Sequence, residues 1–270
     1  MKRMFAMSIL IAGGVVFLSF SSQAAIYLGQ RVRATTPLEQ IDHSDWNHLL
    51  QKYVNQDGMV NYRAWHASAS DRQALSTYLS HLSTGSVNSK ASTDAKLAFW
   101  INAYNAVTIA GILREYPTTS IRNHTPRVFG YNIWKDLQLY VDGQPRSLNH
   151  IEHEILRKLN EPRIHFAIVC ASISCPRLLN EAYTADRIQQ QLDDNARDFF
   201  SRRQNFQHSD GQFQLSAILD WFGSDFGPTQ AQRLKSIAVW LPTERAQQLA
   251  DSGGVQVSYL DYNWKLNEQR

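Results

Sequence analysis

The chain has 270 residues, of which 43% are apolar and 19% charged, with a formal net charge of +3 and two cysteines. Intrinsic disorder is excluded, because it requires a lower hydrophobicity or a higher net charge. A small disulfide-stapled scaffold is excluded as well, because it requires many more cysteines. The length therefore predicts a globular protein of one large or two small domains, with enough residues to bury a core.

The first 24 residues have the features of a secretory signal peptide. Lys2 and Arg3 precede residues 4–20, of which 13 of 17 are apolar, and small side chains follow up to Ala24. We predict cleavage before Ala25 and a periplasmic or secreted protein; the alternative is an uncleaved anchor, although the apolar run is marginal for a full span. Without Lys2 and Arg3 the net charge is +1. No other window reaches 18 apolar residues, and no Lys/Arg-rich run or nucleic-acid motif appears, so we expect no membrane span after cleavage and no nucleic-acid partner.

Apolar residues at helical spacing dominate the first half of the mature chain. Residues 25–37 lack a strong periodicity and predict an extended arm, while helices are predicted over 38–53, from residue 75 to near 85, and over 93–117. The last of these is the strongest, because Ser92 or Thr93 caps it and apolar side chains surround it almost completely. This pattern predicts a central, buried helix.

Strand patterns appear in the second half. Residues 135–141 alternate polar and apolar side chains before Asp142-Gly143, which predicts a hairpin. Ser147 or Asn149 then caps a predicted helix that ends before Pro162, and residues 164–169 predict a buried strand. The remaining predictions are helices over 184–200, 215–222, 229–240 and 244–250, and strands over 213–215 and 255–264.

No internal repeat and no long linker divides the chain. We therefore expect residues 25–270 to form a single, helix-rich α+β domain with a short, mainly antiparallel sheet.

The residues that can carry chemistry are concentrated between His150 and Pro176. Proline is favoured at the first position of a helix, so Cys175 is expected to cap a helix at Pro176, where free amides lower a thiol pKa and can hold an oxyanion. Cys170 is then the structural thiol. Because these are the only two cysteines and an oxidising compartment is expected, a Cys170–Cys175 disulfide is the competing interpretation.

A thiolate nucleophile needs a base, and spacing alone does not select one. His153 and His165 are the nearest candidates in the sequence. His150, His153 and Glu154 lie at helical spacing and form an alternative metal site, but without an HExxH pattern. The GxSxG, GxxxxGK and GxGxxG motifs are absent, and we expect no cofactor.

Two asparagines stand out on the predicted buried helix. Asn102 and Asn105 are three residues apart and share a face of an otherwise apolar helix. Buried amides need hydrogen-bond partners. They are therefore expected either to tether a neighbouring loop or to orient a catalytic base or a substrate amide.

Ordered motifs over about residues 97–267 resemble the family called domain of unknown function 547. They are AFWINAYNA (98–106), SL (147–148), IEH (151–153), ILR (155–157), RIHFA (163–167), Cys170, SCP (174–176), WF (221–222), DF (225–226) and YLDYNWKLN (259–267). The family's closing motif usually reads Tyr-Asp-Trp, whereas this chain has Tyr262-Asn263-Trp264.

The resemblance implies a domain that occurs in bacterial secreted proteins and at the C-terminus of larger plant proteins. Its motifs imply a papain- or transglutaminase-like arrangement in which a cysteine meets a histidine of a neighbouring element. It favours Cys175 as a functional residue, with Glu152, His153 and Arg157 as companions that match its motifs.

Two functions follow as hypotheses. The first is a periplasmic thiol-dependent hydrolase or transferase acting on amide bonds of peptides or cell-wall fragments, with Cys175 as nucleophile, His153 or His165 as base, and Glu152 or an asparagine orienting the histidine. The second is a non-catalytic binding or accessory domain with a Cys170–Cys175 disulfide. Both imply a peptide or small-molecule ligand.

Overall fold

The computed structural model describes residues 25–126, 131–209 and 211–269, so the predicted signal peptide lies outside the described residues. Its centre is α4 (Thr93–Glu115), which begins where the Ser92 hydroxyl accepts a hydrogen bond from the Ala95 amide at 3.1 Å. The helix is buried along almost its whole length, as predicted. Within the described residues, no helix combines the length and the apolar character needed to cross a membrane.

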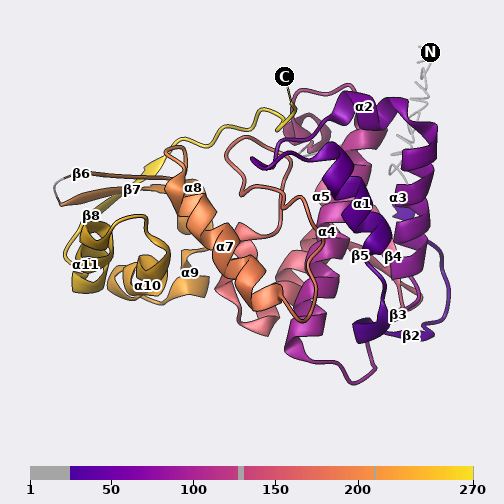
Figure 1. Ribbon diagram of the computed structural model, residues 1–270, viewed down its shortest axis with the longest axis horizontal. Helices are drawn as coiled ribbons and strands as arrows, with labels where there is room; N and C mark the ends of the chain where they lie inside the picture. Colours follow the sequence, from indigo (N-terminus) through magenta and orange to yellow (C-terminus); the bar gives the residue numbers. More distant parts are fainter. Residues whose placement is uncertain (1–24, 127–130, 210, 270) are drawn as a thin grey trace, which may run out of the picture.

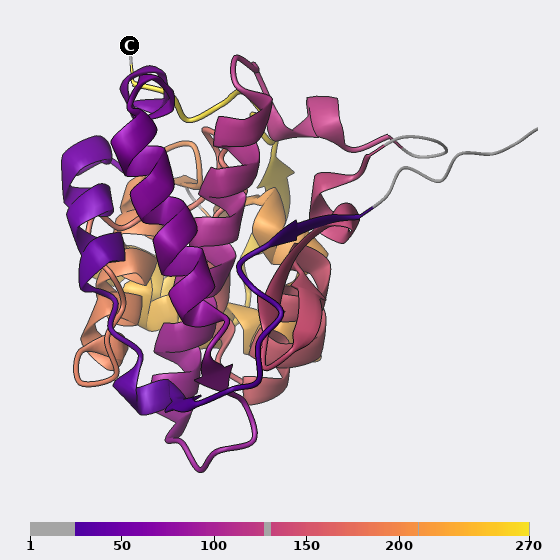
Figure 2. The ribbon, with the colours of Figure 1, turned by 90° about the vertical axis from the view of Figure 1, so that its right-hand side faces the viewer.

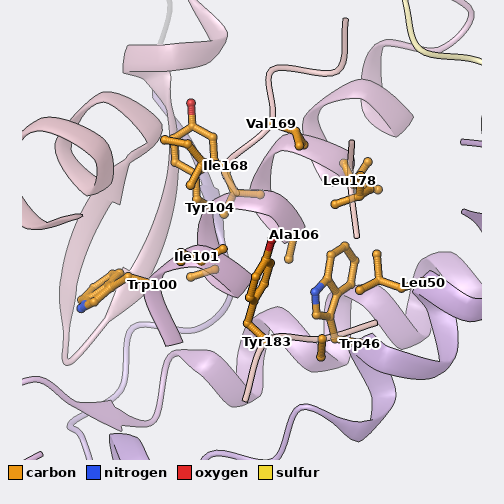
Figure 3. Packing of buried hydrophobic residues seen from close by; sticks show 14 of the residues in the cluster. Trp46, Leu50, Trp100, Ile101, Tyr104, Ala106, Ile168, Val169, Leu178 and Tyr183 are labelled. Carbon is orange, nitrogen blue, oxygen red and sulfur yellow. The ribbon is translucent and has the colours of Figure 1, made fainter. Parts of the chain in front are cut away.

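Three helices of the N-terminal part pack beside α4. They are α1 (Ser44–Tyr53), α2 (Tyr62–Ala67) and α3 (Ala69–Leu82), and Figures 1 and 2 show α1 and α3 running alongside α4. Aromatic stacking joins them, with ring centroids 5.9 Å apart for Trp46 and Tyr78 and 4.7 Å apart for Tyr53 and Trp65. Figure 3 shows Trp46 of α1, Ala106 of α4 and Tyr183 within the larger hydrophobic cluster.

The helix-rich α+β class is confirmed, but the strands form three small sheets of mixed direction rather than one mainly antiparallel sheet. The first has the order β1 (Ile26–Leu28), β4 (Leu137–Val141), β5 (Gln144–Ser147), and the second pairs β2 (Thr36–Pro37) with β3 (Gly85–Ser86). The third is β6 (Phe206–Ser209), β7 (Gln212–Ser216), β8 (Gln256–Leu260). Among the named strands of the described residues, antiparallel pairing occurs in the two hairpins, and strands far apart in sequence pair in parallel. An isolated antiparallel bridge also joins Ser172 to Leu266.

A second hydrophobic cluster surrounds β6–β8 and the C-terminal helices. These helices are α8 (Ala217–Trp221), α9 (Gly223–Phe226), α10 (Gln230–Ile237) and α11 (Glu244–Ser252). The long helix α7 (Ile188–Ser201) contributes to both clusters, with Leu192 in the first and Phe199 in the second. After β8 the chain returns to the larger cluster, as the yellow segment in Figure 1 shows.

Two local predictions are wrong, and both concern the approach to the cysteines. Residues 164–169 do not form a strand: Pro162 begins a short 3₁₀ helix (η5, Pro162–Phe166), and the backbone after it bonds to an asparagine side chain instead of a neighbouring strand. No helix begins at Pro176 either, because the chain continues as an irregular segment until α7. Cys175 is therefore not a helix cap.

The helix predicted after Ser147 is present, but its hydrogen-bonding pattern changes from α-helical to π-helical and then to 3₁₀. It consists of α6 (Leu148–His150), a π-helical stretch (η3, Ile151–Leu156) and a 3₁₀ turn (η4, Arg157–Leu159). It ends at Asn160, which has a left-handed backbone with φ of 55°. π-Helical insertions occur frequently at functional sites, and this one carries Glu152 and His153.

Candidate functional site

Asn105 of α4 holds the loop that carries both cysteines. The Asn105 amide donates to the Ala167 carbonyl at 3.0 Å, and its carbonyl oxygen accepts from the Val169 amide at 3.0 Å. Ala171 then has a left-handed backbone with φ of 55°, a conformation that costs a non-glycine residue about 1–2 kcal/mol. The surrounding contacts must hold this turn, which brings Cys170 and Cys175 together.

Backbone hydrogen bonds from the C-terminal segment hold the same loop as well. The Ile173 amide bonds to the Lys265 carbonyl at 2.9 Å, and the Ser174 amide bonds to the Asn263 carbonyl at 3.2 Å. The Asn263 side chain is turned to its own backbone, where it accepts from the Lys265 amide at 3.1 Å. An aspartate can accept that bond as well, so this departure from the family's Tyr-Asp-Trp motif keeps the turn.

These constraints surround the Cys175 sulfur with hydrogen-bond donors. The Cys170 amide donates to Cys175 Sγ at 2.9 Å, and the Tyr262 hydroxyl donates to it at 3.2 Å. The Tyr262 oxygen in turn accepts a hydrogen bond from the Ser172 hydroxyl at 3.2 Å. Both cysteines are free thiols in this structure. The donors therefore meet at one sulfur, that of Cys175.

This arrangement separates the acidities of the two thiols. Burial opposes ionisation of Cys175 and is the largest single influence on it, but the hydrogen bonds from Cys170 and Tyr262 outweigh burial and lower its pKa from 9.0 to about 6. The hydrogen bond to Cys175, together with burial, raises the pKa of Cys170. Cys175 is therefore the more acidic of the two thiols. The low pKa that the sequence predicted for Cys175 therefore arises from these hydrogen bonds and not from the helix N-terminus that was expected.

The two candidate bases belong to one charged network at the wall of the cavity. His165, only 3% exposed, makes a 2.8 Å hydrogen bond through Nε2 to Asp225 Oδ2. Arg157 binds both oxygens of Asp225 at 2.6 Å and lies 3.1 Å from Nδ1 of His153. Burial lowers the pKa of His165 although Asp225 favours its charged form. The Asp225 pKa is lowered to about 2, mainly by Arg157.

Glu152 is the acidic side chain of the site. Its Oε2 accepts a hydrogen bond from the Tyr104 hydroxyl at 3.1 Å. Burial raises its pKa, and the negative charge of Cys175 adds to the effect. Glu152 thus does not orient a histidine; Asp225 has that role for His165.

The predicted cysteines, histidines and glutamate line one cavity of about 180 Å³. Aromatic side chains form much of the rest of its wall. The full lining is Tyr104, Trp134, Asn149, Glu152, His153, His165, Ile168, Val169, Cys170, Cys175, Pro176, Ile218, Trp221, Phe222, Tyr262 and Trp264. Figure 3 labels three of these residues, Tyr104 of α4 and the neighbouring pair Ile168 and Val169.

Three further predicted residues do not line this cavity. Asn102 holds Tyr183, donating to its carbonyl at 2.8 Å and accepting from its amide at 3.0 Å, and Asn105 holds the cysteine loop. The tethering interpretation therefore describes both asparagines. Arg157 acts through Asp225 and His153, as described above.

The alternative metal ligands point to different partners. His150 Nε2 lies 2.7 Å from Arg146, and Glu154 pairs with Lys158 at 2.6 Å. In the part of the chain that the structure describes, no group of three or more His, Cys, Asp or Glu side chains is arranged to hold a metal ion. The hypothesised cluster of His150, His153 and Glu154 is not formed.

Sequence reasoning assigned no role to four residues that shape the site. They are Tyr104, Asp225, Tyr262 and Trp264. Each lies within a segment that carries the family resemblance, so the available signal was the motif. Their hydrogen-bond partners could not be predicted from the sequence, because these partners are distant along the chain. Tyr262 is 87 positions from Cys175, and Asp225 is 60 positions from His165.

Comparison with known families agrees with the resemblance over part of the chain. Residues 88–200 match the family described as "Protein of unknown function, DUF547". The matched region contains α4, the π-helical stretch and both cysteines, whereas Asp225 and Tyr262 lie beyond it. No curated protein matches the chain, and no solved structure does.

Proposed function

We propose that this protein is a thiol-dependent acyl-transfer enzyme, a hydrolase or transferase that acts on amide bonds of peptides or cell-wall fragments in the periplasm. The supporting observation is the Cys175 sulfur, which accepts hydrogen bonds from the Cys170 amide and the Tyr262 hydroxyl inside a cavity lined by two histidines and a glutamate. A thiolate at neutral pH beside proton-transferring groups is what nucleophilic catalysis by cysteine requires.

In the first half-reaction the Cys175 thiolate attacks the amide carbonyl carbon. A carbon–sulfur bond forms, and the carbonyl electron pair moves to oxygen, for which the Tyr262 hydroxyl is a donor close to the reacting sulfur. The carbon–nitrogen bond then breaks and the amine leaves with a proton. That proton comes from solvent water, and the proton that His165 takes up in the second half-reaction is returned to solvent, so the proton balance of the cycle closes.

In the second half-reaction water or an amine attacks the thioester. His165 is the base, because Asp225 holds its Nε2 and so leaves Nδ1 to accept the proton. The Nδ1 of His153 faces the Arg157 guanidinium at 3.1 Å, so this nitrogen is not free to accept the proton. Breaking the carbon–sulfur bond returns the electron pair to Cys175.

Thiol alkylation against pH tests the nucleophile. Native full-length protein is treated with iodoacetamide, and the modified cysteine is identified by mass spectrometry. We expect rapid modification of Cys175 near neutral pH in the wild type and in Cys170→Ala, and loss of that reaction in Cys175→Ala. A Cys175 that stays unreactive after mild reduction contradicts the proposal.

A second assay tests acyl transfer itself. After incubation with p-nitrophenyl acetate, the intact mass is expected to show one acetyl group on Cys175, which is removed by water or an added amine. Asp225→Asn is expected to slow removal of the acetyl group more than its formation. If the acetyl group forms and persists unchanged in the wild type, the deacylation step assigned to His165 is wrong.

A non-catalytic binding domain is the second candidate. It is favoured by the Tyr262 hydroxyl, which lies 3.2 Å from both sulfurs and so marks how closely the two thiols approach. In an oxidising compartment this proximity favours a Cys170–Cys175 disulfide. A count of two free thiols in protein isolated without reductant is the result that excludes this form.

A further inference from the structure

The outer wall of the cavity is a cluster of aromatic rings. The Tyr262 centroid lies 4.5 Å from that of Trp264 and 4.9 Å from that of Trp221, with interplanar angles of 50° and 48°. Trp221 is 48% exposed and stacks on Trp264 with centroids 5.7 Å apart. All three rings also line the cavity. We call Trp221, Tyr262 and Trp264 the aromatic wall.

In the described part of the chain, the ionisable side chains that line the cavity include acids but no permanently charged base. Among the described residues that line it, none is lysine or arginine, whereas Glu152 and the Cys175 thiolate are both acids. The guanidinium of Arg157 is bound to Asp225 behind the histidines. A ligand entering this space meets negative charge and negative ring faces together.

One residue of the aromatic wall, Trp264, already has a cation as its partner. The Arg122 guanidinium lies 5.1 Å from the centroid of the Trp264 ring. This is the usual distance for a cation–π contact, and tryptophan is the strongest partner in such contacts. Arg122 is exposed and does not line the cavity. Trp221 and Tyr262 have no such partner among the described cation–π contacts.

The cavity has a size that suits a small ligand group. Its volume is about 180 Å³. A cavity of about 150 Å³ holds a molecule as large as benzene. A compact alkylated ammonium group fits such a space.

We infer that the cavity recognises a ligand bearing a small cationic group, a protonated or quaternary ammonium, which sits against Trp221 and Tyr262 with Glu152 supplying the counter-charge. This inference rests on the proposed function where it names the substrate class: the substrate of Cys175 is an amide whose acyl part carries such a group. The recognition itself needs no chemistry at Cys175.

A pair of isosteres tests the inference. Choline and 3,3-dimethylbutan-1-ol have the same shape and differ in the positive charge. Binding is measured by isothermal titration calorimetry to the full chain carrying Cys175→Ala, so that no reaction occurs. We expect choline to bind roughly tenfold more tightly than the neutral alcohol. Equal affinities, or no binding of choline, overturn the inference.

Variants locate the binding. In the Cys175→Ala background, Trp221→Leu and Glu152→Gln are each expected to weaken choline binding about tenfold, whereas Trp221→Phe, which keeps a ring, recovers part of it. The control is Tyr27→Leu, which removes a ring of similar exposure (51%) that stacks on Tyr140 and does not line the cavity. Choline binding that is unchanged in both Trp221→Leu and Glu152→Gln also overturns the inference.

These results are independent of the test of the nucleophile. Choline binding together with an unreactive Cys175 would support the ammonium site and contradict the proposed enzymatic activity. A reactive Cys175 without selectivity for choline would support the proposed enzymatic activity and contradict the ammonium-bearing substrate class.

Discussion

The Tyr262 hydroxyl donates a 3.2 Å hydrogen bond to the sulfur of Cys175 across 87 positions of sequence. The contact exists because the chain after β8 crosses back to the larger hydrophobic cluster and pairs with the cysteine loop. The C-terminal segment therefore completes a site whose thiol, glutamate and histidines lie in the family-matched region.

Removing this hydroxyl should make Cys175 less acidic. A hydrogen bond to a charged group is worth about 1.5–3 kcal/mol, so Tyr262→Phe should raise the pKa of Cys175 by about one unit or more. The midpoint of the iodoacetamide rate against pH measures this change. Tyr259→Phe is the matched control, because Tyr259 is 42% exposed on β8 and does not line the cavity. Identical midpoints in the wild type and Tyr262→Phe would show that this contact does not stabilise the thiolate.

Asp225 should stabilise the fold in a pH-dependent way. Its pKa is lowered to about 2 from 3.8, so its stabilising effect is fully present above pH 3.8 and is lost as the pH falls through 2. Asp225→Asn leaves Arg157 and His165 without their carboxylate and should lower the free energy of unfolding by about 3 kcal/mol at neutral pH.

Urea unfolding at several pH values measures this difference between wild type and Asp225→Asn. The difference should shrink between pH 4 and pH 2. The control is Glu161→Gln, which breaks the Arg163 ion pair away from the cavity and should leave the reactivity of Cys175 unchanged. A difference that is constant with pH contradicts the role assigned to Asp225.

The sequence predicted the burial of α4 and the hairpin at Asp142-Gly143, because local periodicity and turn chemistry decide such elements. It also selected Cys175, Glu152, His153 and His165, which line one cavity. It failed where tertiary contacts replace local ones. Residues 164–169 have the composition of a strand, but their backbone bonds to the Asn105 side chain, and no periodicity encodes that partner.

Asn102 and Asn105 form a natural pair for separating stability from function. Both lie on α4 and bind a backbone carbonyl and a backbone amide, but Asn105 holds the cysteine loop and Asn102 holds Tyr183. Substituting either by alanine leaves two buried backbone groups unpaired, which should cost about 2–3 kcal/mol of unfolding free energy. Only Asn105→Ala should also slow alkylation of Cys175, because the loop it releases carries the Cys170 amide. Equal alkylation rates in the two variants, measured below their unfolding temperatures, would mean that other contacts fix this loop.

The two thiols should form a disulfide on oxidation more readily than cysteines placed at random. The Cys170 amide already lies 2.9 Å from Cys175 Sγ, and the acidic Cys175 is the attacking thiolate that disulfide exchange with an oxidised dithiol such as oxidised dithiothreitol requires. That exchange forms the Cys170–Cys175 bond and reduces the reagent to its dithiol. Non-reducing peptide mapping after such treatment should find the bridge, with loss of iodoacetamide reactivity that returns on reduction. Cys170→Ala should keep its reactivity after brief treatment, because it lacks the second thiol that closes the intramolecular bond. A wild type that keeps two free thiols after prolonged treatment would mean that the loop, held by Asn105 and the C-terminal segment, prevents the sulfurs from bonding.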